Sequence, residues 1–130
     1  MFDWKKPTVQ MLGRWQPWHE GHQALFKRCF AKTGHVIILV RDVQGTSGGR
    51  GQDDNPFDLA EVCKNIEAGL AKDGFHRGEE YEIMLVPNIV NITYGRGVGY
   101  TLEEEVFDKS TSGISATKIR EELRKKGELD

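Results

Sequence analysis

Two histidines stand three residues apart in a short segment that is unusual for the interior of a protein. The segment GRWQPWHEGH, residues 13–22, places His19 and His22 just after an apolar run, with Gly21 directly before the second histidine. Residues spaced i and i+3 share one face at the start of a helix, where free N–H groups and the helix dipole attract phosphate. The imidazoles would add hydrogen-bond donors, and the glycine lets a planar ligand approach the backbone. The segment therefore indicates a site for a phosphate-bearing ligand.

A metal site and a plain helix start are the alternatives for this segment. A zinc site needs three or four protein ligands, and neither the other histidines, His35 and His76, nor the two cysteines have suitable spacing. The zinc-protease pattern H-E-x-x-H does not match, because the second histidine comes one residue early. We therefore predict no protein-held metal, and two surface histidines at a helix start remain the structural alternative.

A second candidate segment, SGISATKIREEL at residues 112–123, lies near the other end of the chain. Ser115 and Thr117 place hydroxyl groups at the start of an expected helix, and Lys118 and Arg120 add cations in its first turn or so. A serine cap followed by a threonine and a lysine is common in ordinary helices. A cation near a helix N-terminus, however, opposes the helix dipole, and an anion bound there would explain its presence.

Alternating strands and helices must position these two segments. We expect strands at 9–12, 35–40 and 81–87, and helices at 20–33, 57–71 and 114–127. A polar, glycine-rich loop covers 41–56, and a short extended piece at 89–94 and a last strand near 105–107 follow the third strand. This alternation predicts a single α/β domain over residues 1–130, with a doubly wound parallel sheet of the Rossmann-like kind.

Sheets of this kind bind ligands beyond the carboxyl ends of their strands. The histidine segment, the pair Arg41-Asp42 and Asn88 each follow one of the expected strands. We therefore expect a pocket for a small acceptor near these strand ends, built from Trp18, Arg41, Asp42, Asn88, Tyr94 and Arg96. For the two aromatic residues of this set, packing in the core is an equally good interpretation.

The overall composition limits the class of protein. A chain of 130 residues with 38% hydrophobic and 29% charged residues is typical of one soluble globular domain. The net charge of −2 argues against a general nucleic-acid binder. No signal peptide is visible, and the longest apolar run, 36–40, is too short to span a membrane. We expect a cytoplasmic protein without a membrane partner, with Cys29 and Cys63 as reduced thiols, and a homo-oligomer is compatible with the sequence.

The candidate segments resemble the signatures of one enzyme superfamily. GRWQPWHEGH resembles the (H/T)-x-G-H signature of nucleotidylyltransferases, in the longer form G-R-x-Q-P-x-H-x-G-H of archaeal-type nicotinamide-nucleotide adenylyltransferases. GISATKIREEL resembles the second signature of the superfamily, I-S-x-T-x-I-R, and DNPFDLAEV is similar to the N-P-F-x-x-x-E segment of the same adenylyltransferases. The two signatures occur in the expected order, and the resemblance covers nearly the whole chain.

The resemblance implies nucleotidyl transfer, in which the phosphate of a small acceptor attacks the α-phosphorus of a nucleoside triphosphate and pyrophosphate leaves. Mg²⁺ is expected, bound mainly through the triphosphate. His19, His22 and Arg120 are then the catalytic residues, and the nucleotide-binding residues are Gly13, Arg14, Gly21, Ser115, Thr117 and Lys118.

The resemblance leaves the substrates open. The chain ending is also close to short cytidylyltransferases that use CTP and glycerol phosphate, but Ser110-Thr111-Ser112 stand where those enzymes carry an arginine and a threonine. The adenylyltransferases have a longer chain before the last signature, where this protein has the unfamiliar segment NITYGRGVGY. ATP is favoured over CTP, and a non-catalytic nucleotide sensor on the same fold is the alternative to an enzyme.

Overall fold

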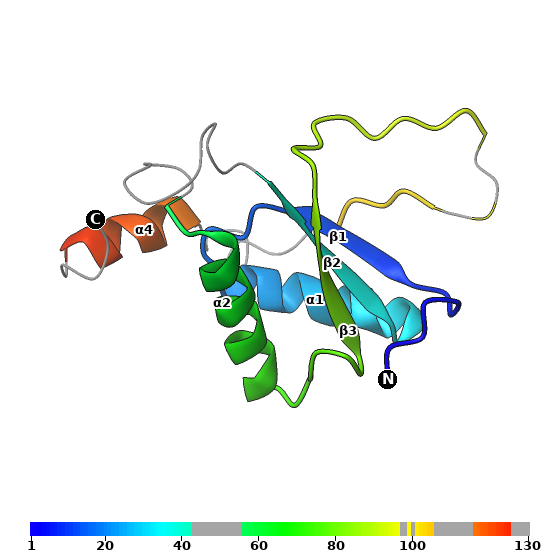
Figure 1. The fold of residues 1–130 in the computed structure, drawn as a ribbon, viewed down its shortest axis with the longest axis horizontal. Helices are drawn as coiled ribbons and strands as arrows, with labels where there is room; N and C mark the ends of the chain where they lie inside the picture. The colour runs from blue at the N-terminus through cyan, green and yellow to red at the C-terminus, as the bar shows by residue number, and fades with distance from the viewer. Residues whose placement is uncertain (43–55, 97–98, 100, 106–115, 126–130) are drawn as a thin grey trace.

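The structure, a computed structural model, describes residues 1–42, 56–96, 99, 101–105 and 116–125. Its elements follow the chain as β1 (Val9–Gly13), α1 (Glu20–Thr33), β2 (Val36–Arg41), α2 (Leu59–Lys72), β3 (Tyr81–Val86) and α4 (Ala116–Lys125) (Figure 1). The bounds from β1 to β3 lie within two residues of the predicted ones. None of the described helices is long and apolar enough to span a lipid bilayer.

The three described strands form one parallel sheet in the order β1-β2-β3. The central strand, β2, places Ile38 between Met11 of β1 and Ile83 of β3. The unbroken β-branched and aliphatic run of β2 is typical of a mostly buried strand in a parallel sheet. Because parallel neighbours need a crossover, α1 connects β1 to β2 and α2 connects β2 to β3.

The core lies on one face of this sheet. Side chains alternate along a strand, so Met11, Ile38 and Ile83 share a face, and all three are buried. The buried side chains of both crossover helices join the same cluster: Phe26 and Cys29 from α1, and Val62, Ile66 and Leu70 from α2. Both helices therefore cover the same face.

The predicted doubly wound arrangement is found only in part. A doubly wound sheet carries helices on both faces and strands on both sides of β1. In the described residues, α1 and α2 cover one face and β1 lies at the sheet edge. The extended piece at 89–94 has no strand pairing, and most of the strand predicted near 105–107 lies outside the described residues. The structure is thus a small α/β unit, β1-α1-β2-α2-β3, that is compatible with a Rossmann-like fold.

Capping residues define the ends of the two crossover helices. Gly34 follows α1 with a left-handed φ of 73°, which glycine adopts without strain, and its N–H donates to the carbonyl of Phe30 at 2.7 Å. Asp58 caps the start of α2, where its side chain accepts from the N–H of Glu61 and the Glu61 carboxylate accepts from the N–H of Asp58. Gly34 thus ends α1, and Asp58 begins α2.

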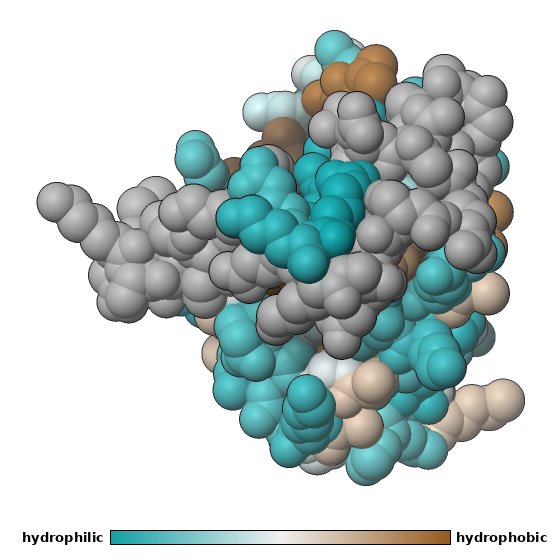
Figure 2. All heavy atoms as spheres, turned by 90° about the vertical axis from the view of Figure 1, so that its left-hand side faces the viewer, coloured by the Kyte–Doolittle hydropathy of each residue, from teal (hydrophilic) through white to brown (hydrophobic). Residues whose placement is uncertain are grey.

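The carboxyl ends of the strands, the start of α1 and α4 lie on the same side of the molecule (Figure 1). Viewed from that side, most of the visible described residues are hydrophilic, and hydrophobic residues lie toward the edges of the view (Figure 2). This polar side is where the sequence places its candidate site.

Candidate active site

The two histidines cap α1 with each other's help. His19 is the N-cap residue, and its Nδ1 accepts hydrogen bonds from the N–H groups of Gly21 at 3.0 Å and His22 at 3.4 Å. In return, Nδ1 of His22 accepts from the N–H of His19 at 3.2 Å. This reciprocal pattern is a capping box, made here of two imidazoles in place of the usual hydroxyl and carboxylate side chains. The histidines therefore fix the beginning of α1.

This cap revises the expectation that the first amides of α1 are free to bind phosphate. The N–H groups of Gly21 and His22 already donate to His19 Nδ1, and the N–H of Gln23 donates to the carbonyl of His19 at 2.9 Å. A phosphate at this helix end would therefore be bound by the imidazole groups and not by these amides.

Both imidazoles are held in the neutral form. The rings stack with centroids 3.7 Å apart and planes inclined by 16°, and Trp15 and Trp18 flank the His22 ring at 4.8 and 5.5 Å. Burial lowers the pKa of both histidines, and burial together with the neighbouring His19 lowers the pKa of His22 to about 3. Because each Nδ1 accepts a hydrogen bond, the hydrogen-bond pattern assigns the remaining ring proton to Nε2. Each ring is thus a neutral donor through Nε2–H at pH 7.

The loop between β1 and α1 is fixed by Trp15. This residue has a φ of 54°, in the left-handed region that non-glycine residues rarely adopt. Its buried Nε1 donates to the carbonyl of Leu39 at 3.1 Å, and its ring lies so close to Gly13 that a Cβ there would come within 2.9 Å of it. Gly13, predicted as a nucleotide contact, therefore has a packing role in holding the tryptophan ring.

Arg120 reaches from α4 to the same loop. Its guanidinium is buried, and Nη1 donates to the backbone carbonyl of Gln16 at 2.6 Å, across 104 residues of sequence. The Gln16 side chain in turn binds both main-chain groups of Phe57, in the segment before α2, with Nε2 donating to the Phe57 carbonyl at 2.9 Å and Oε1 accepting from the Phe57 N–H at 2.8 Å. Gln16 thus joins three segments; it lies within the first signature-like segment but was assigned no role from the sequence.

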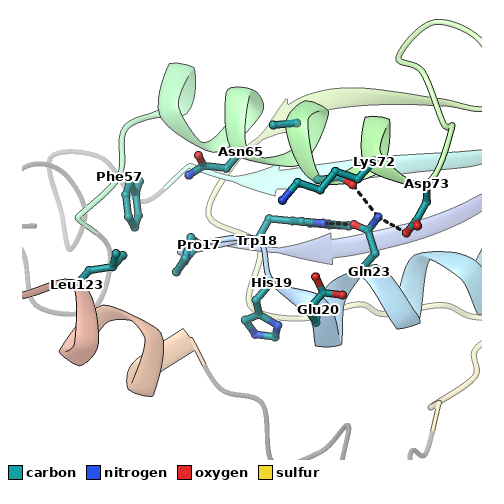
Figure 3. A pocket seen from close by; sticks show the side chains of 12 residues that line it. Pro17, Trp18, His19, Glu20, Gln23, Phe57, Asn65, Lys72, Asp73 and Leu123 are labelled. Carbon is teal, nitrogen blue, oxygen red and sulfur yellow. Dashed lines mark hydrogen bonds between the residues drawn. The ribbon is translucent and has the colours of Figure 1, made fainter. Parts of the chain in front are cut away.

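A cavity of about 530 Å³ lies beside His19, between the first half of α1 and α2, with Leu123 of α4 at one end (Figure 3). Trp18 is 8% exposed at its wall, and its Nε1 donates to Gln23 Oε1 at 2.7 Å. Gln23 donates onward to the Gly69 carbonyl at 2.8 Å and to Asp73 at 2.7 Å. These contacts favour the packing interpretation of Trp18, although the residue does line the cavity.

The structure does not gather the predicted acceptor residues in one place. Arg41 donates to Asn88 Oδ1 at 2.8 Å, and the N–H of Asp42 donates to the Val86 carbonyl at 2.8 Å, so these residues gather where β2 and β3 end. The Nε of Arg41 is buried and has no hydrogen-bond partner among the described residues. Tyr94 instead lines a cavity of about 940 Å³ along the outer edge of β1. The structure therefore does not bring Tyr94 to the strand ends.

Other predicted site residues are only partly described. Arg14 and Arg96 are exposed. Ser115 lies outside the described residues, and Thr117 and Lys118 belong to α4 but their side chains are not described. The three predicted catalytic residues, His19, His22 and Arg120, all lie within the described part of the chain.

No family model matches the chain, and no curated protein matches it. The likeness to nucleotidylyltransferases therefore stays a resemblance.

Proposed function

We propose that this protein is a nucleotidylyltransferase that moves AMP, or alternatively CMP, from a nucleoside triphosphate to the phosphate of a small acceptor. The observation that carries the proposal is the 2.6 Å hydrogen bond from Arg120 to the carbonyl of Gln16. Two segments that resemble the two signatures would mean little if they lay apart in the fold. Here the second segment contributes a buried guanidinium to the loop that leads into the first.

The chemistry asked of these residues is charge stabilisation. An oxygen of the acceptor phosphate attacks the α-phosphorus in line, the bond from that phosphorus to the β-bridging oxygen breaks, and pyrophosphate leaves. Donors placed where negative charge develops lower the barrier because they need no reorganisation. The neutral rings of His19 and His22 would donate through Nε2–H, and Arg120 would supply positive charge for the departing pyrophosphate.

Mg²⁺ would be held mainly by the substrates. Among the described residues, no group of three His, Cys, Asp or Glu side chains could hold a metal ion. Mg²⁺ prefers phosphate oxygens and water to a complete protein cage, and it would neutralise part of the triphosphate charge. Such a site needs no dedicated carboxylates.

The acceptor would bind near the ends of β2 and β3. Arg41 lies there, with one nitrogen on Asn88 and a buried Nε without a partner in the described part of the chain. A guanidinium is well suited to hold a phosphate through paired hydrogen bonds. We therefore propose a phosphorylated small molecule as acceptor, with ATP ahead of CTP as donor on the strength of the sequence resemblance.

The test is to incubate the full chain with labelled ATP or CTP, Mg²⁺ and a panel of phosphorylated acceptors, including nicotinamide mononucleotide and glycerol 3-phosphate. Pyrophosphate that forms only when donor and acceptor are both present, together with a nucleotidylated product, supports the proposal. If no pair yields pyrophosphate, the protein is not this enzyme. Tight nucleotide binding without pyrophosphate would instead favour the sensor alternative.

A further inference from the structure

We propose that Gln16 is a positioning residue, which holds Arg120 and the histidine cap in one fixed arrangement. This inference rests on the proposed function. Gln16 is 5% exposed and uses both ends of its side-chain amide and its backbone carbonyl on two segments far away in sequence.

The side chain of Gln16 binds Phe57 in a way that few other residues could reproduce. The amide donates to the Phe57 carbonyl and accepts from the Phe57 N–H, as a neighbouring strand would. Glutamate keeps the acceptor but loses the donor, methionine loses both, and asparagine is one methylene shorter. Because the amide cannot rotate without giving up both bonds, it fixes the position of the Gln16 main chain.

The main chain of Gln16 in turn fixes Arg120. A hydrogen bond from a charged donor is stronger than one between neutral groups, and a buried guanidinium loses stability when such a bond is broken. The bond from Arg120 Nη1 therefore ties this side chain of α4 to the Gln16 carbonyl. His19 comes three residues later in the same loop and begins α1. Gln16 thus links the cation to the loop that leads into the two imidazoles.

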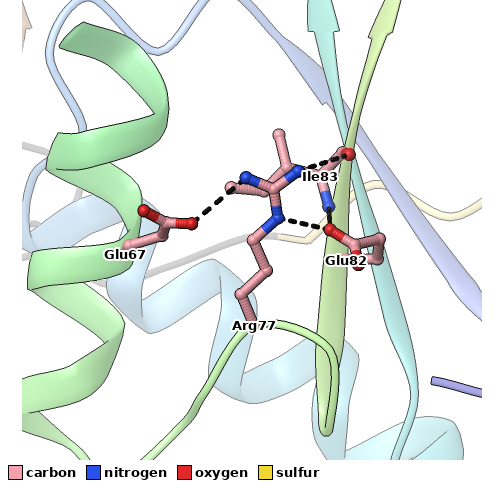
Figure 4. Close-up of polar contacts among 4 residues, drawn as sticks. All are labelled: Glu67, Arg77, Glu82 and Ile83. Carbon is pink, nitrogen blue, oxygen red and sulfur yellow. Dashed lines mark hydrogen bonds and ion pairs between the residues drawn. The ribbon is translucent and has the colours of Figure 1, made fainter. Parts of the chain in front are cut away.

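The kinetic test compares Gln16→Met, Gln16→Glu and a matched control at the other end of the sheet. The control is Arg77→Met, since Arg77 also makes several contacts between distant elements: it binds Glu67 of α2 at 3.1 Å, Glu82 of β3 and the Ile83 carbonyl (Figure 4). We expect Gln16→Met to lower kcat at least tenfold with the KM of the nucleotide within threefold. Arg77→Met should lower the Tm by a comparable amount and leave kcat unchanged.

A double-mutant cycle asks whether Gln16 acts through Arg120. If it does, Gln16→Met combined with Arg120→Lys will have a kcat within twofold of Arg120→Lys alone. If the two substitutions lower kcat by factors that multiply, the proposal is overturned.

Gln16→Glu adds a second readout, because a protonated carboxyl has the donor that glutamine has. Its kcat relative to that of the original chain should rise between pH 8 and pH 6, since burial raises the pKa of a carboxyl. If this ratio of kcat values does not change with pH, the contacts of the Gln16 side chain with Phe57 do not control kcat.

An NMR measurement keeps this inference separate from the proposed function. In the full chain labelled with ¹⁵N-arginine, the Arg120 guanidinium should give a signal protected from exchange with water. The protection should be lost in Gln16→Met and kept in Arg77→Met. If it survives in Gln16→Met, Gln16 does not position Arg120. If the protection behaves as expected but no acceptor yields pyrophosphate, the proposed function fails while the positioning role stands.

Discussion

His19 and His22 hold each other in place: their rings stack with centroids 3.7 Å apart, and each Nδ1 accepts a hydrogen bond from the backbone N–H of the other residue. One pair of contacts therefore serves two purposes. It satisfies the N–H groups of His19 and His22 at the start of α1, and it fixes each ring in the form that carries its proton on Nε2. A helix cap and a pair of oriented donors are built from the same two side chains.

Removing one imidazole should cost most of the catalysis. We expect His22→Ala to lower kcat about 100-fold or more, corresponding to about 3 kcal/mol, as for the loss of a donor to a developing negative charge. The measurement is pyrophosphate release with a saturating triphosphate and an active acceptor. A fall of less than tenfold would remove His22 from the mechanism.

A suitable control for His22→Ala is Asp58→Ala, which breaks the capping box of α2 and leaves both imidazoles in place. It should cost about 1 kcal/mol of stability, as cap substitutions do, with turnover unchanged. This control separates the loss of a helix cap from the loss of a catalytic donor.

Acid should destabilise the fold through His22. Its pKa is about 3 in the folded protein, below the ordinary value of 6.5, so the unfolded chain binds more protons between these values. Stability therefore rises with pH in this window, and as pH falls below 6.5 it is lost by up to about 1.4 kcal/mol per pH unit. Urea unfolding at pH 7 and pH 5.5 should show this loss, and it should be smaller in His22→Asn. An imidazole signal of His22 that titrates near 6.5 in the folded protein would contradict the assignment.

Gly69 of α2 should resist a substitution that normally stabilises helices. Alanine in place of an interior helical glycine usually gains about 1 kcal/mol. A Cβ at Gly69 would come within 2.8 Å of Trp18 Cδ1 and 3.3 Å of Gln23 Oε1, in the network that joins the two helices. We expect Gly69→Ala to lose about 1–3 kcal/mol, as overpacked cores do. Thermal or urea unfolding gives the sign directly, and a stabilised variant would show that Trp18 is not packed as described.

Local signals predicted the described elements well. The bounds of α1 follow from its apolar spacing and from Gly34, and those of β2 from its aliphatic run, because both depend on neighbouring residues. The winding of the sheet depends instead on contacts between distant segments, and the predicted helices on both faces are not found in the described residues.

The candidate site was predicted less completely than the fold. The spacing of His19 and His22 pointed to one helix face, but capping by imidazole was not foreseen, since serine, threonine, aspartate and asparagine are the usual caps. Gln16 lies within the quoted form G-R-x-Q-P-x-H-x-G-H but was given no role, and Gln23 was missed, because their partners lie 41 to 50 residues away in the sequence. The bond from Arg120 to Gln16 could not be derived from either segment alone.

The claim that the two segments form one triphosphate site is tested most directly by a crystal structure with Mg²⁺ and an α,β-methylene analogue of ATP or CTP, which cannot release pyrophosphate. We expect the triphosphate within hydrogen-bond distance of Nε2 of both histidines and of the Arg120 guanidinium, and the base that is retained identifies the donor. A triphosphate bound elsewhere, or one that contacts neither imidazole, would contradict the claim that the two segments form one site.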